Sequence, residues 1–374
     1  MKLGIDATNI KSGGGAVHLI ELLNRFSKED DVEIIVWCNT VISKSLIESE
    51  NIRIISLNRI FNNPIIRAFW QIIFLASSAK KLSCDVLFFP GGSYIGTFRP
   101  FVSMSQNMLP FSPLEINRYS FSLRKIKLLI LKYWQQLSFI NSQGIIFLSL
   151  YAKKIISGTI DISSSKHAVI PHGINKKFFL IKKKKFDKFF PKAVYVSTID
   201  EYKHHEKVIR AIGNLKNNGI HVQLDIIGSS YKPALKRLKR SIQSLDLKNS
   251  INILGAINNS DIAKKFQEYD FAIFASSCEN QPIALLEKMA SGLPICCSSM
   301  EPMPEVLLNG GLYFDPLSVD DIERTIKKII SCDQSREKIS RISKELSFKY
   351  NWEETSAKTI HFLREVSNSF KTRI

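Results

Sequence analysis

The chain has 374 residues, of which 45% are hydrophobic, and its formal net charge is +18 at pH 7. A chain of this length and composition predicts two packed domains of similar size. Its apolar runs are too short to cross a membrane, and its start continues directly into a strand without a signal-peptide pattern, so we expect a cytoplasmic protein.

The six cysteines are scattered along the chain without a C-x-x-C pair. This distribution predicts reduced, buried thiols and argues against a disulfide framework or a zinc site. Two interpretations of the positive charge stay open. One is compositional drift in a chain rich in Ile, Lys, Asn and Ser, and the other is attraction to anionic lipid.

Short apolar strands alternate with longer helical patterns, which predicts parallel sheets with helices on both faces. The expected strands of the first half are Lys2–Ile5, Val32–Trp37, Ile52–Ser56, Val86–Phe89, Phe101–Met104, Gly144–Leu148 and Ala168–Ile170. Those of the second half are Ala193–Ser197, Val222–Ile227, Ile251–Leu254, Phe271–Ala275 and Leu293–Cys297. The Lys- and Phe-rich stretch Pro171–Lys192, which contains Lys182–Lys185, is predicted to be a linker between two Rossmann-like halves.

A glycine-rich turn follows the first strand. It contains Gly13, Gly14 and Gly15, and we expect a helix to begin after Ala16. Three glycines at a strand-to-helix turn let the backbone approach a ligand closely, although a plain flexible turn is the alternative. The spacing is not the G-x-G-x-x-G fingerprint of dinucleotide-binding proteins.

Two stretches of the first half predict helices that are both apolar and basic. Asn63 suits the cap and Pro64 the first position of a helix that continues to Leu75. A second helix is expected over residues 118–139, with three cations at heptad spacing on one face: Arg118, Lys125 and Lys132. Basic residues beside Trp, Tyr and Leu suit the interface of an anionic membrane, whereas core helices with solvated lysines would show the same pattern.

The most informative stretch lies between Ser276 and Pro294. It predicts a tight loop after a buried strand and then a helix that ends at Gly292. Pro282 suits the first helical position, where its missing N–H costs nothing. The loop and the first helical turn would therefore direct free N–H groups toward an anionic ligand.

Glu279 lies in this loop, and Glu287 follows eight residues later within the helix. Two carboxylates beside an anion site suit a diphosphate that carries a hydroxyl-rich sugar on each side, because carboxylates accept hydrogen bonds from hydroxyl groups. The alternative is that Glu279 caps the helix and Glu287 is a solvated helix residue.

This stretch resembles the E-x7-E motif of the retaining glycosyltransferases of family 4, which include bacterial mannosyl- and glucosyltransferases. The preceding strand, the two glutamates and the close at Met289–Pro294 all resemble that motif. The resemblance implies an α/β fold of the GT-B class, in which two Rossmann-like domains with parallel sheets face a central cleft. The acceptor-binding domain would span 1–172 and the nucleotide-sugar-binding domain 173–352, with 173–192 as the linker. A C-terminal helix within 353–374 would cross back to the first domain.

The resemblance also implies roles in donor binding. Glu279 would hold the hydroxyl groups of the donor sugar, and Glu287 the ribose. Lys203 matches the lysine that neutralises the donor diphosphate, but Ser197, Thr198 and Ile199 occupy the region where the family places an arginine. The remaining donor-binding residues would be Gly14, Gly15, Ser197, Gly228, Asn280, Gln281, Pro282 and Ile283. The neighbours of Lys203, His204 and His205, have no partner at a metal-ligand spacing and are expected on the surface.

In the first domain, Pro90–Ser93 occupies the turn where many relatives carry a histidine. Gln106 and Asn107 are amides, which can hydrogen-bond a sugar or an acceptor but cannot act as general bases. The resemblance thus implies acceptor binding by Gly13 and Asn107, although Asn107 would suit a turn cap equally well. The residues expected to act in catalysis are Glu279, Lys203 and Asn107.

A double displacement needs a carboxylate nucleophile in the first domain, and no convincing candidate is found, since Asp85 precedes its strand. We therefore expect front-face attack with retention, in which the departing phosphate acts as the base, and no metal cofactor. The expected partners are a GDP- or UDP-sugar and a glycan or polyprenyl-diphosphate-linked acceptor in the synthesis of surface polysaccharide, lipopolysaccharide or O-antigen. Peripheral contact with the inner face of the plasma membrane is a further hypothesis.

Two other functions are weighed against this one. A nucleotide-sugar 2-epimerase of the same two-domain shape should show more acidic and histidine side chains in the cleft. A nucleic-acid-binding protein is suggested only by charge, because the chain lacks a recognition motif and a dense arginine cluster. Binding of nucleic acid is therefore not expected.

Overall fold

The structure is a computed structural model that describes residues 1–29, 31–181 and 185–372. The chain divides into two compact units. Unit 1 comprises Met1–Pro113, Phe121–Gly173 and Asn351–Ile374, and unit 2 comprises Leu114–Ser120 and Ile174–Tyr350. Lys182–Lys184 of the expected linker lie outside the described residues.

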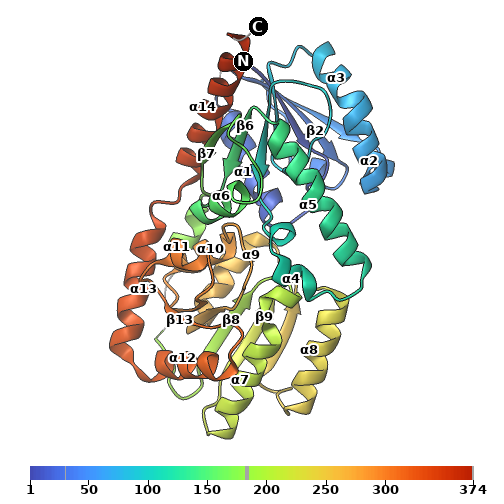
Figure 1. The fold of residues 1–374 in the computed structure, drawn as a ribbon. Coiled ribbons are helices and arrows are strands. Elements are labelled where there is room, and N and C mark those ends of the chain that lie inside the picture. Colours follow the sequence, from blue (N-terminus) through green and yellow to red (C-terminus); the bar gives the residue numbers. More distant parts are fainter. Residues whose placement is uncertain (30, 182–184, 373–374) are drawn as a thin grey trace. The chain divides into compact units, whose positions relative to one another are not determined.

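Unit 1 contains a parallel sheet, of which β2, β6 and β7 are labelled in Figure 1. Its strand order is β3-β2-β1-β4-β5-β6-β7. Its strands are β1 Lys2–Ala7, β2 Glu33–Asn39, β3 Ile52–Leu57, β4 Val86–Phe89, β5 Phe101–Ser105, β6 Gly144–Phe147 and β7 Lys166–Val169. Each strand predicted for the first half is present, within two residues of its expected bounds. The continuous apolar runs reflect burial on both faces, which is usual for parallel sheets.

Helices cover both faces of this sheet, because successive side chains of each strand point to opposite sides. Phe88 belongs to the core that packs against α1 (Gly14–Phe26) and α14 (Trp352–Lys371). Leu87 and Phe89 belong to the opposite core, which contains residues of α3 (Ala76–Lys81). The remaining helices of unit 1 are α2 Pro64–Trp70, α5 Leu123–Asn141 and α6 Leu150–Ser157.

The two apolar and basic helices differ in how well they were predicted. Asn63 caps α2 as expected, since its Oδ1 accepts from the Ile65 N–H at 2.9 Å, and the helix continues through one π-helical turn, Gln71–Leu75, into α3. The expected start of the second helix was wrong. Ser120 adopts φ of 47°, Ser122 is the cap, and α5 begins at Leu123, so Arg118 does not share a helical face with the lysines.

Helix α14 packs within unit 1 and begins one residue before the expected range. Asn351 caps it by accepting from the Glu354 N–H at 2.7 Å. A Cβ atom added at Gly144 of β6 would lie 2.8 Å from Val366, so only glycine permits this close approach of strand and helix. Ion pairs from Arg364 to Asp31 and from Lys371 to Asp85 tie the outer face of α14 to the same unit.

Two histidines meet in the interior of unit 1, where their Nδ1 atoms lie 2.9 Å apart. His18 comes from α1 and His172 from the end of the segment that follows β7, and both rings contact Trp352, with ring centroids at 5.5 and 5.9 Å. Burial lowers the pKa of His18 to about 3 and holds the pKa of His172 well below its ordinary value. The pair is therefore neutral at physiological pH.

This buried pair should make unit 1 sensitive to acid. Below the ordinary histidine pKa of about 6.5 the unfolded chain takes up protons that the folded chain cannot, so stability falls as the pH decreases toward 3. At about pH 5 we expect a loss of up to about 2 kcal/mol for each histidine. All four tryptophans lie in unit 1, so urea unfolding followed by tryptophan fluorescence measures it.

A matched pair of substitutions tests the origin of this acid sensitivity. His18→Gln should flatten the dependence of the urea midpoint on pH, whereas His361→Gln, at an exposed position of α14, should leave it unchanged. Equal slopes for the native chain and for His18→Gln would contradict the assignment.

Unit 2 has a second parallel sheet, with the order β10-β9-β8-β11-β12-β13. Its strands are β8 Lys192–Val196, β9 Gln223–Ile227, β10 Ile251–Gly255, β11 Phe271–Phe274, β12 Ile295–Ser298 and β13 Leu312–Phe314. Its helices are α4 Pro113–Asn117, α7 His205–Asn217, α8 Lys232–Ser244, α9 Asn259–Lys265, α10 Ile283–Ser291, α11 Met303–Leu307, α12 Val319–Ser331 and α13 Asp333–Ser347. The sequence did not reveal β13, because three residues are too few to show a periodicity.

A short segment from the first half of the chain, Leu114–Ser120, belongs to unit 2. The Tyr119 hydroxyl donates to the Asp200 carboxylate at 2.9 Å, and its ring packs edge-on against Tyr231 with centroids 5.8 Å apart. The two parallel sheets with their helices confirm the predicted α/β fold class.

Candidate active site

The loop between β11 and α10 lies at the carboxyl end of the unit 2 sheet. Ligands of open α/β sheets bind at this end. Helix α10 begins at Ile283, with Pro282 as the cap residue, so the predicted helix start was one residue early. The first intrahelical bonds come from the Leu285 and Leu286 N–H groups to the Pro282 carbonyl. Gly292 ends the helix in the left-handed conformation, with φ of 68°, as predicted.

The structure brings together two of the predicted site residues, Lys203 and Glu279. Lys203 ends a 3₁₀ turn, Glu201–Lys203, that follows β8, and its Nζ forms an ion pair with Glu279 Oε1. Both side chains are largely buried, with 9% and 14% of their surface exposed. The ammonium also lies over the rings of Tyr202 and Phe274, at 4.9 and 5.6 Å from their centroids.

The backbone around this ion pair is fixed by a buried tyrosine. The Tyr195 hydroxyl donates to the Lys203 carbonyl at 2.6 Å and accepts from the Ala275 N–H at 3.2 Å. This one side chain therefore connects the loop after β8 with the loop after β11. Asn280 and Gln281, which directly follow Glu279 in the second loop, are also buried. Glu287 of α10 is buried as well.

Sequence reasoning missed Lys288, which immediately follows Glu287. Its side chain is fully buried, and its Nζ donates to the Ala284 carbonyl at 3.0 Å and to the Val196 carbonyl at 3.4 Å. Burial lowers the pKa of Lys288 to about 7, and the Glu287 carboxylate partly offsets this effect. A lysine among apolar residues of a helix was the one available signal for this group.

Gly228 holds the loop after β8 close to the loop after β9. Its φ of 148° is unfavourable for other residues, and a Cβ atom at this position would overlap the Ser197 carbonyl oxygen. Ser197 in turn contacts His205 Nε2 through its hydroxyl at 3.1 Å. Leu254 and Gly255 are the last residues of β10, the strand next to β9 in the sheet, and Gly255 has φ of 72°.

The expectation that His204 and His205 lie on the surface was wrong. They are 6% and 3% exposed, because the His205 ring stacks on Tyr195 at 4.4 Å and His204 Nε2 contacts the Ser277 hydroxyl at 2.7 Å. Burial lowers the pKa of each to about 3. They help to fix the site as neutral rings.

In unit 1, the glycine-rich turn meets an amide side chain. Gly13 caps α1 with φ of 72°, and α1 begins at Gly14, earlier than predicted. A Cβ atom at Gly15 would lie 2.9 Å from Gln106 Oε1. Asn107 is exposed, and its Oδ1 accepts from the N–H of Leu109, the first residue of the 3₁₀ turn Leu109–Phe111, at 3.0 Å. The roles of Gly13 and Asn107 in acceptor binding stay predictions.

Two carboxylates at the first sheet are engaged in hydrogen bonds. Asp6, in β1, is buried and accepts from the Thr8 N–H at 2.9 Å and from the Gln71 amide. Asp85 accepts from the Lys2 N–H at 2.7 Å and pairs with Lys371. Burial raises the pKa of Asp6, which the bond from Thr8 opposes. Both groups therefore have structural partners.

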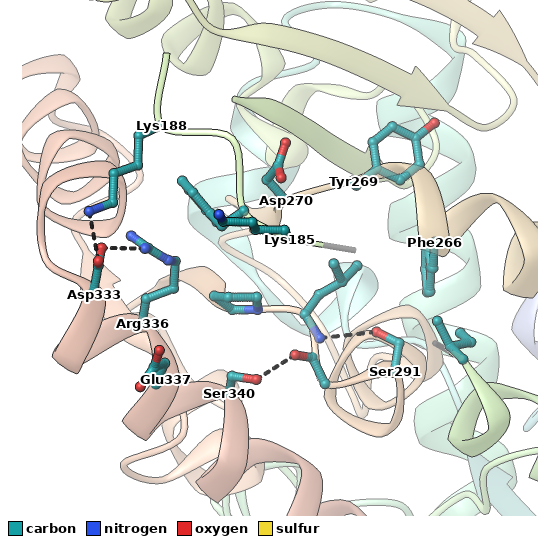
Figure 2. A pocket seen from close by; sticks show the side chains of 15 residues that line it. Lys185, Lys188, Phe266, Tyr269, Asp270, Ser291, Asp333, Arg336, Glu337 and Ser340 are labelled. Carbon is teal, nitrogen blue, oxygen red and sulfur yellow. Dashed lines mark hydrogen bonds and ion pairs between the residues drawn. The ribbon is translucent and has the colours of Figure 1, made fainter. Parts of the chain in front are cut away.

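A cavity of about 390 Å³ lies at the opposite end of the unit 2 sheet (Figure 2). Asp270 and Pro294, which precede β11 and β12, line it. Asp333 pairs with both Lys188 and Arg336, and the Arg336 guanidinium also donates to the Ile329 carbonyl at 2.7 Å. These charged groups bond to one another and to the end of a helix, so we do not propose this cavity as an active site.

No described helix combines the length and apolar character needed to cross a bilayer. All six cysteines are free thiols, and Cys38, Cys278, Cys296 and Cys297 are buried.

Models of two glycosyltransferase families together match most of the chain. Residues 12–178 match the family model described as Glycosyltransferase Family 4, and residues 176–346 match the one described as Glycosyl transferases group 1. A Salmonella typhimurium protein named O-antigen chain mannosyltransferase RfbU is 26% identical over 212 residues, which cover 57% of each chain. The match thus spans little more than half the length of that relative.

Solved structures agree in fold over nearly the whole chain. Sucrose-phosphate synthase from Thermosynechococcus elongatus has a TM-score of 0.78 at 14% identity, covering 99% of this chain and 100% of that one. Anabaena HepE in complex with UDP and glucose has a TM-score of 0.72 at 16% identity, covering 97% and 99%. With both family models matched in sequence, the chain belongs to the family 4 glycosyltransferases of the GT-B fold.

Proposed function

We propose that this enzyme transfers a hexose-type sugar, with retention of configuration, from a nucleoside-diphosphate sugar to a hydroxyl group of a glycan acceptor. The observation that carries this proposal is the buried Lys203–Glu279 pair beside the start of α10. A cation and a helix N-terminus together favour a diphosphate, and the neighbouring carboxylate can accept hydrogen bonds from sugar hydroxyl groups.

The Lys203–Glu279 ion pair is the starting point for donor binding. When the diphosphate arrives, the Lys203 ammonium turns from Glu279 to a phosphate oxygen, and the released carboxylate accepts from hydroxyl groups of the donor sugar. Backbone N–H groups at the start of α10, beginning with Ile283, stabilise the remaining phosphate charge. Glu287 holds the ribose.

We expect the configuration to be retained through attack on the face from which the phosphate leaves. The acceptor oxygen forms a bond to the anomeric carbon while the bond from that carbon to the phosphate oxygen breaks, and the acceptor proton passes to the leaving phosphate. The protein orients the reactants and stabilises the charge that develops on the diphosphate. The engagement of Asp6 and Asp85 in hydrogen bonds supports this route over a covalent intermediate.

The biological setting and the absence of a metal requirement are also proposals. The relative named O-antigen chain mannosyltransferase supports an acceptor that is a growing bacterial surface polysaccharide. That this acceptor is linked to a polyprenyl diphosphate is our own proposal. Lys203 and the first turn of α10 provide the positive potential that a divalent cation provides elsewhere. We expect transfer to continue in the presence of EDTA.

One assay tests the transfer itself. The chain is incubated with UDP- and GDP-hexoses and with a polyprenyl-diphosphate-linked saccharide, and the product is analysed by NMR. We expect release of one nucleoside diphosphate and a new glycosidic bond with the anomeric configuration of the donor. An inverted product would contradict front-face attack, and binding of oligonucleotides instead of any nucleotide would contradict the function.

We further propose that the enzyme works at an anionic membrane surface. On α2 and the π-helical turn, exposed apolar side chains are Ile65, Phe69, Ile72, Ile73 and Phe74. On α5 they are Leu123, Ile126, Leu129, Ile130 and Tyr133. The helical stretches Pro64–Lys81 and Leu123–Asn141 contain seven Lys and Arg residues and no acidic residue, so charge complementarity favours anionic lipid as the partner.

Vesicle co-sedimentation tests this surface. We expect binding to vesicles that contain phosphatidylglycerol, no binding to pure phosphatidylcholine, and a loss of binding at high salt. Replacement of Ile73 and Phe74 by serine should weaken binding, and Lys127→Glu should remove about 1 kcal/mol or more. Leu317→Ser, at an exposed apolar position of unit 2, serves as the control. Equal sedimentation of all variants would contradict the proposal.

A further inference from the structure

The diphosphate site contains a buried cation that the reaction as proposed above does not use. The side chain of Lys288 extends back toward the start of α10, as long helical side chains do, and its Nζ reaches the Ala284 carbonyl in the first turn. Its second acceptor is the carbonyl of Val196, the last residue of β8. The ammonium therefore lies between α10 and the loop that begins at Ser197.

The loop from Ser197 to Lys203 contains no arginine. Ser197, Thr198 and Ile199 occupy that region and carry no charge. Lys288 belongs to helix α10 and not to this loop, but its ammonium reaches the carbonyl of Val196, the residue just before the loop. The chain thus has a second positive charge at the end of β8, although it comes from a different position in the sequence.

Lys288 and Lys203 share one aromatic neighbour. The two Nζ atoms lie 5.2 and 5.6 Å from the centroid of the Phe274 ring. Lys203 has Glu279 as its ion-pair partner, whereas Lys288 forms no ion pair among the residues that the structure describes. Its two acceptors are backbone carbonyls, so its positive charge is not balanced by a bonded carboxylate.

We propose that Lys288 is a positioning residue that supplies the second positive charge for the donor diphosphate, acting from beneath the first turn of α10 on the Lys203–Glu279 pair. This inference rests on the proposed function. Lys288 itself does not touch the phosphates, because its side chain is fully buried. Its charge stabilises the anion through the low-dielectric interior and favours the release of Glu279 from Lys203.

The ionisation of Lys288 makes this effect measurable. Burial, and then the charge of Lys203, lower the pKa of Lys288, to about 7, whereas the Glu287 carboxylate, the Cys297 thiol of β12 and the Glu279 carboxylate raise it. A diphosphate in the site would raise it further, so the amine accepts a proton from solvent when the nucleotide binds. By linkage, each unit by which the ligand raises the pKa adds a factor of about ten to the affinity at a pH below both values.

The sign of the pH dependence follows from this linkage. Below about pH 7 Lys288 is already protonated and the nucleotide gains its full attraction. Above pH 7 the free protein has a neutral amine that must first take up a proton, so the affinity decreases with rising pH. Ionisation of the terminal phosphate, with a pKa of about 6, acts in the opposite direction but equally in every variant.

Titration calorimetry with UDP and with GDP tests the inference. Affinities are measured between about pH 6 and about pH 8, in two buffers of different protonation enthalpy, so that proton uptake is counted directly. For the native chain we expect net proton uptake near pH 7 and an affinity that decreases by up to about tenfold toward pH 8. The variants are Lys288→Met, Lys288→Arg and, as a matched control, Lys344→Met, which removes a lysine that donates to the Phe179 carbonyl.

Each variant has a distinct expected result. Lys288→Met should fold, because replacing a buried charge by an apolar side chain of similar volume is often neutral or stabilising. It should bind about tenfold more weakly near pH 6 and lose the additional proton uptake. Lys288→Arg should keep the affinity and lose the pH dependence, since arginine stays protonated. Lys344→Met should match the native chain.

Two failures are distinguishable. If the native chain binds UDP or GDP and Lys288→Met shows the same affinity and the same proton uptake, Lys288 has only a structural role and the inference is overturned. If neither nucleotide binds the native chain, the proposed function is overturned, and this inference with it.

Discussion

Replacement of Lys203 by methionine should abolish most of the turnover. The substitution removes the ammonium that pairs with Glu279 and that we propose binds the diphosphate. Loss of one preorganised group that stabilises the charge of a transition state lowers kcat by about 100- to 1,000-fold. We expect the rate of nucleoside diphosphate release at saturating donor to decrease by this factor, with a smaller change in KM.

A second substitution separates this effect from a loss of stability. Lys203→Met leaves the largely buried Glu279 carboxylate without its partner, which costs about 3–5 kcal/mol for a fully buried pair. The double variant Lys203→Met, Glu279→Gln should recover much of that stability because both charges are gone, but it should stay inactive. Recovery of turnover together with stability would show that Lys203 acts only in folding.

Replacement of Gly228 by alanine should destabilise unit 2 and also impair donor binding. The new Cβ atom would overlap the Ser197 carbonyl oxygen, and the φ of 148° is strained for any residue other than glycine. We expect a loss of about 3 kcal/mol or more, measured by urea unfolding with circular dichroism. Because the loop that must shift leads to Lys203, nucleotide affinity should decrease as well.

Gly219 provides the control for this substitution. It also has a positive φ, 77°, but a Cβ atom there would meet no atom within 4 Å. Gly219→Ala should therefore cost only the strain of the left-handed backbone, about 1–2 kcal/mol, and leave nucleotide binding unchanged. Equal losses for the two alanine variants would show that the contact with Ser197 has no effect.

Much of the fold was predictable because parallel strands are short apolar runs separated by recognisable helices. The strand from Val86 to Phe89 was predicted to the residue, and Gly292 correctly marked the end of α10. Boundaries failed where a local backbone feature decides them. The left-handed Ser120 ends the regular structure before α5, and serine does not signal such a conformation in a sequence.

The candidate site was predictable where a residue belongs to a family motif. Lys203 and Glu279 were both identified, but their ion pair joins positions that are far apart in the sequence and only the folded sheet brings them together. Lys288 and the two buried histidines, His204 and His205, were missed or misplaced. The burial of a polar side chain depends on the elements that pack over it, and the local sequence does not contain that information.

A crystal structure of the chain with the nucleoside diphosphate that binds best would examine whether the Lys203–Glu279 site is the donor site. We expect a phosphate oxygen within hydrogen-bonding distance of Lys203 Nζ and of the Ile283 N–H, a ribose beside Glu287, and the Lys203–Glu279 pair opened. Nucleotide bound elsewhere, with that pair still closed, would contradict the assignment of the site.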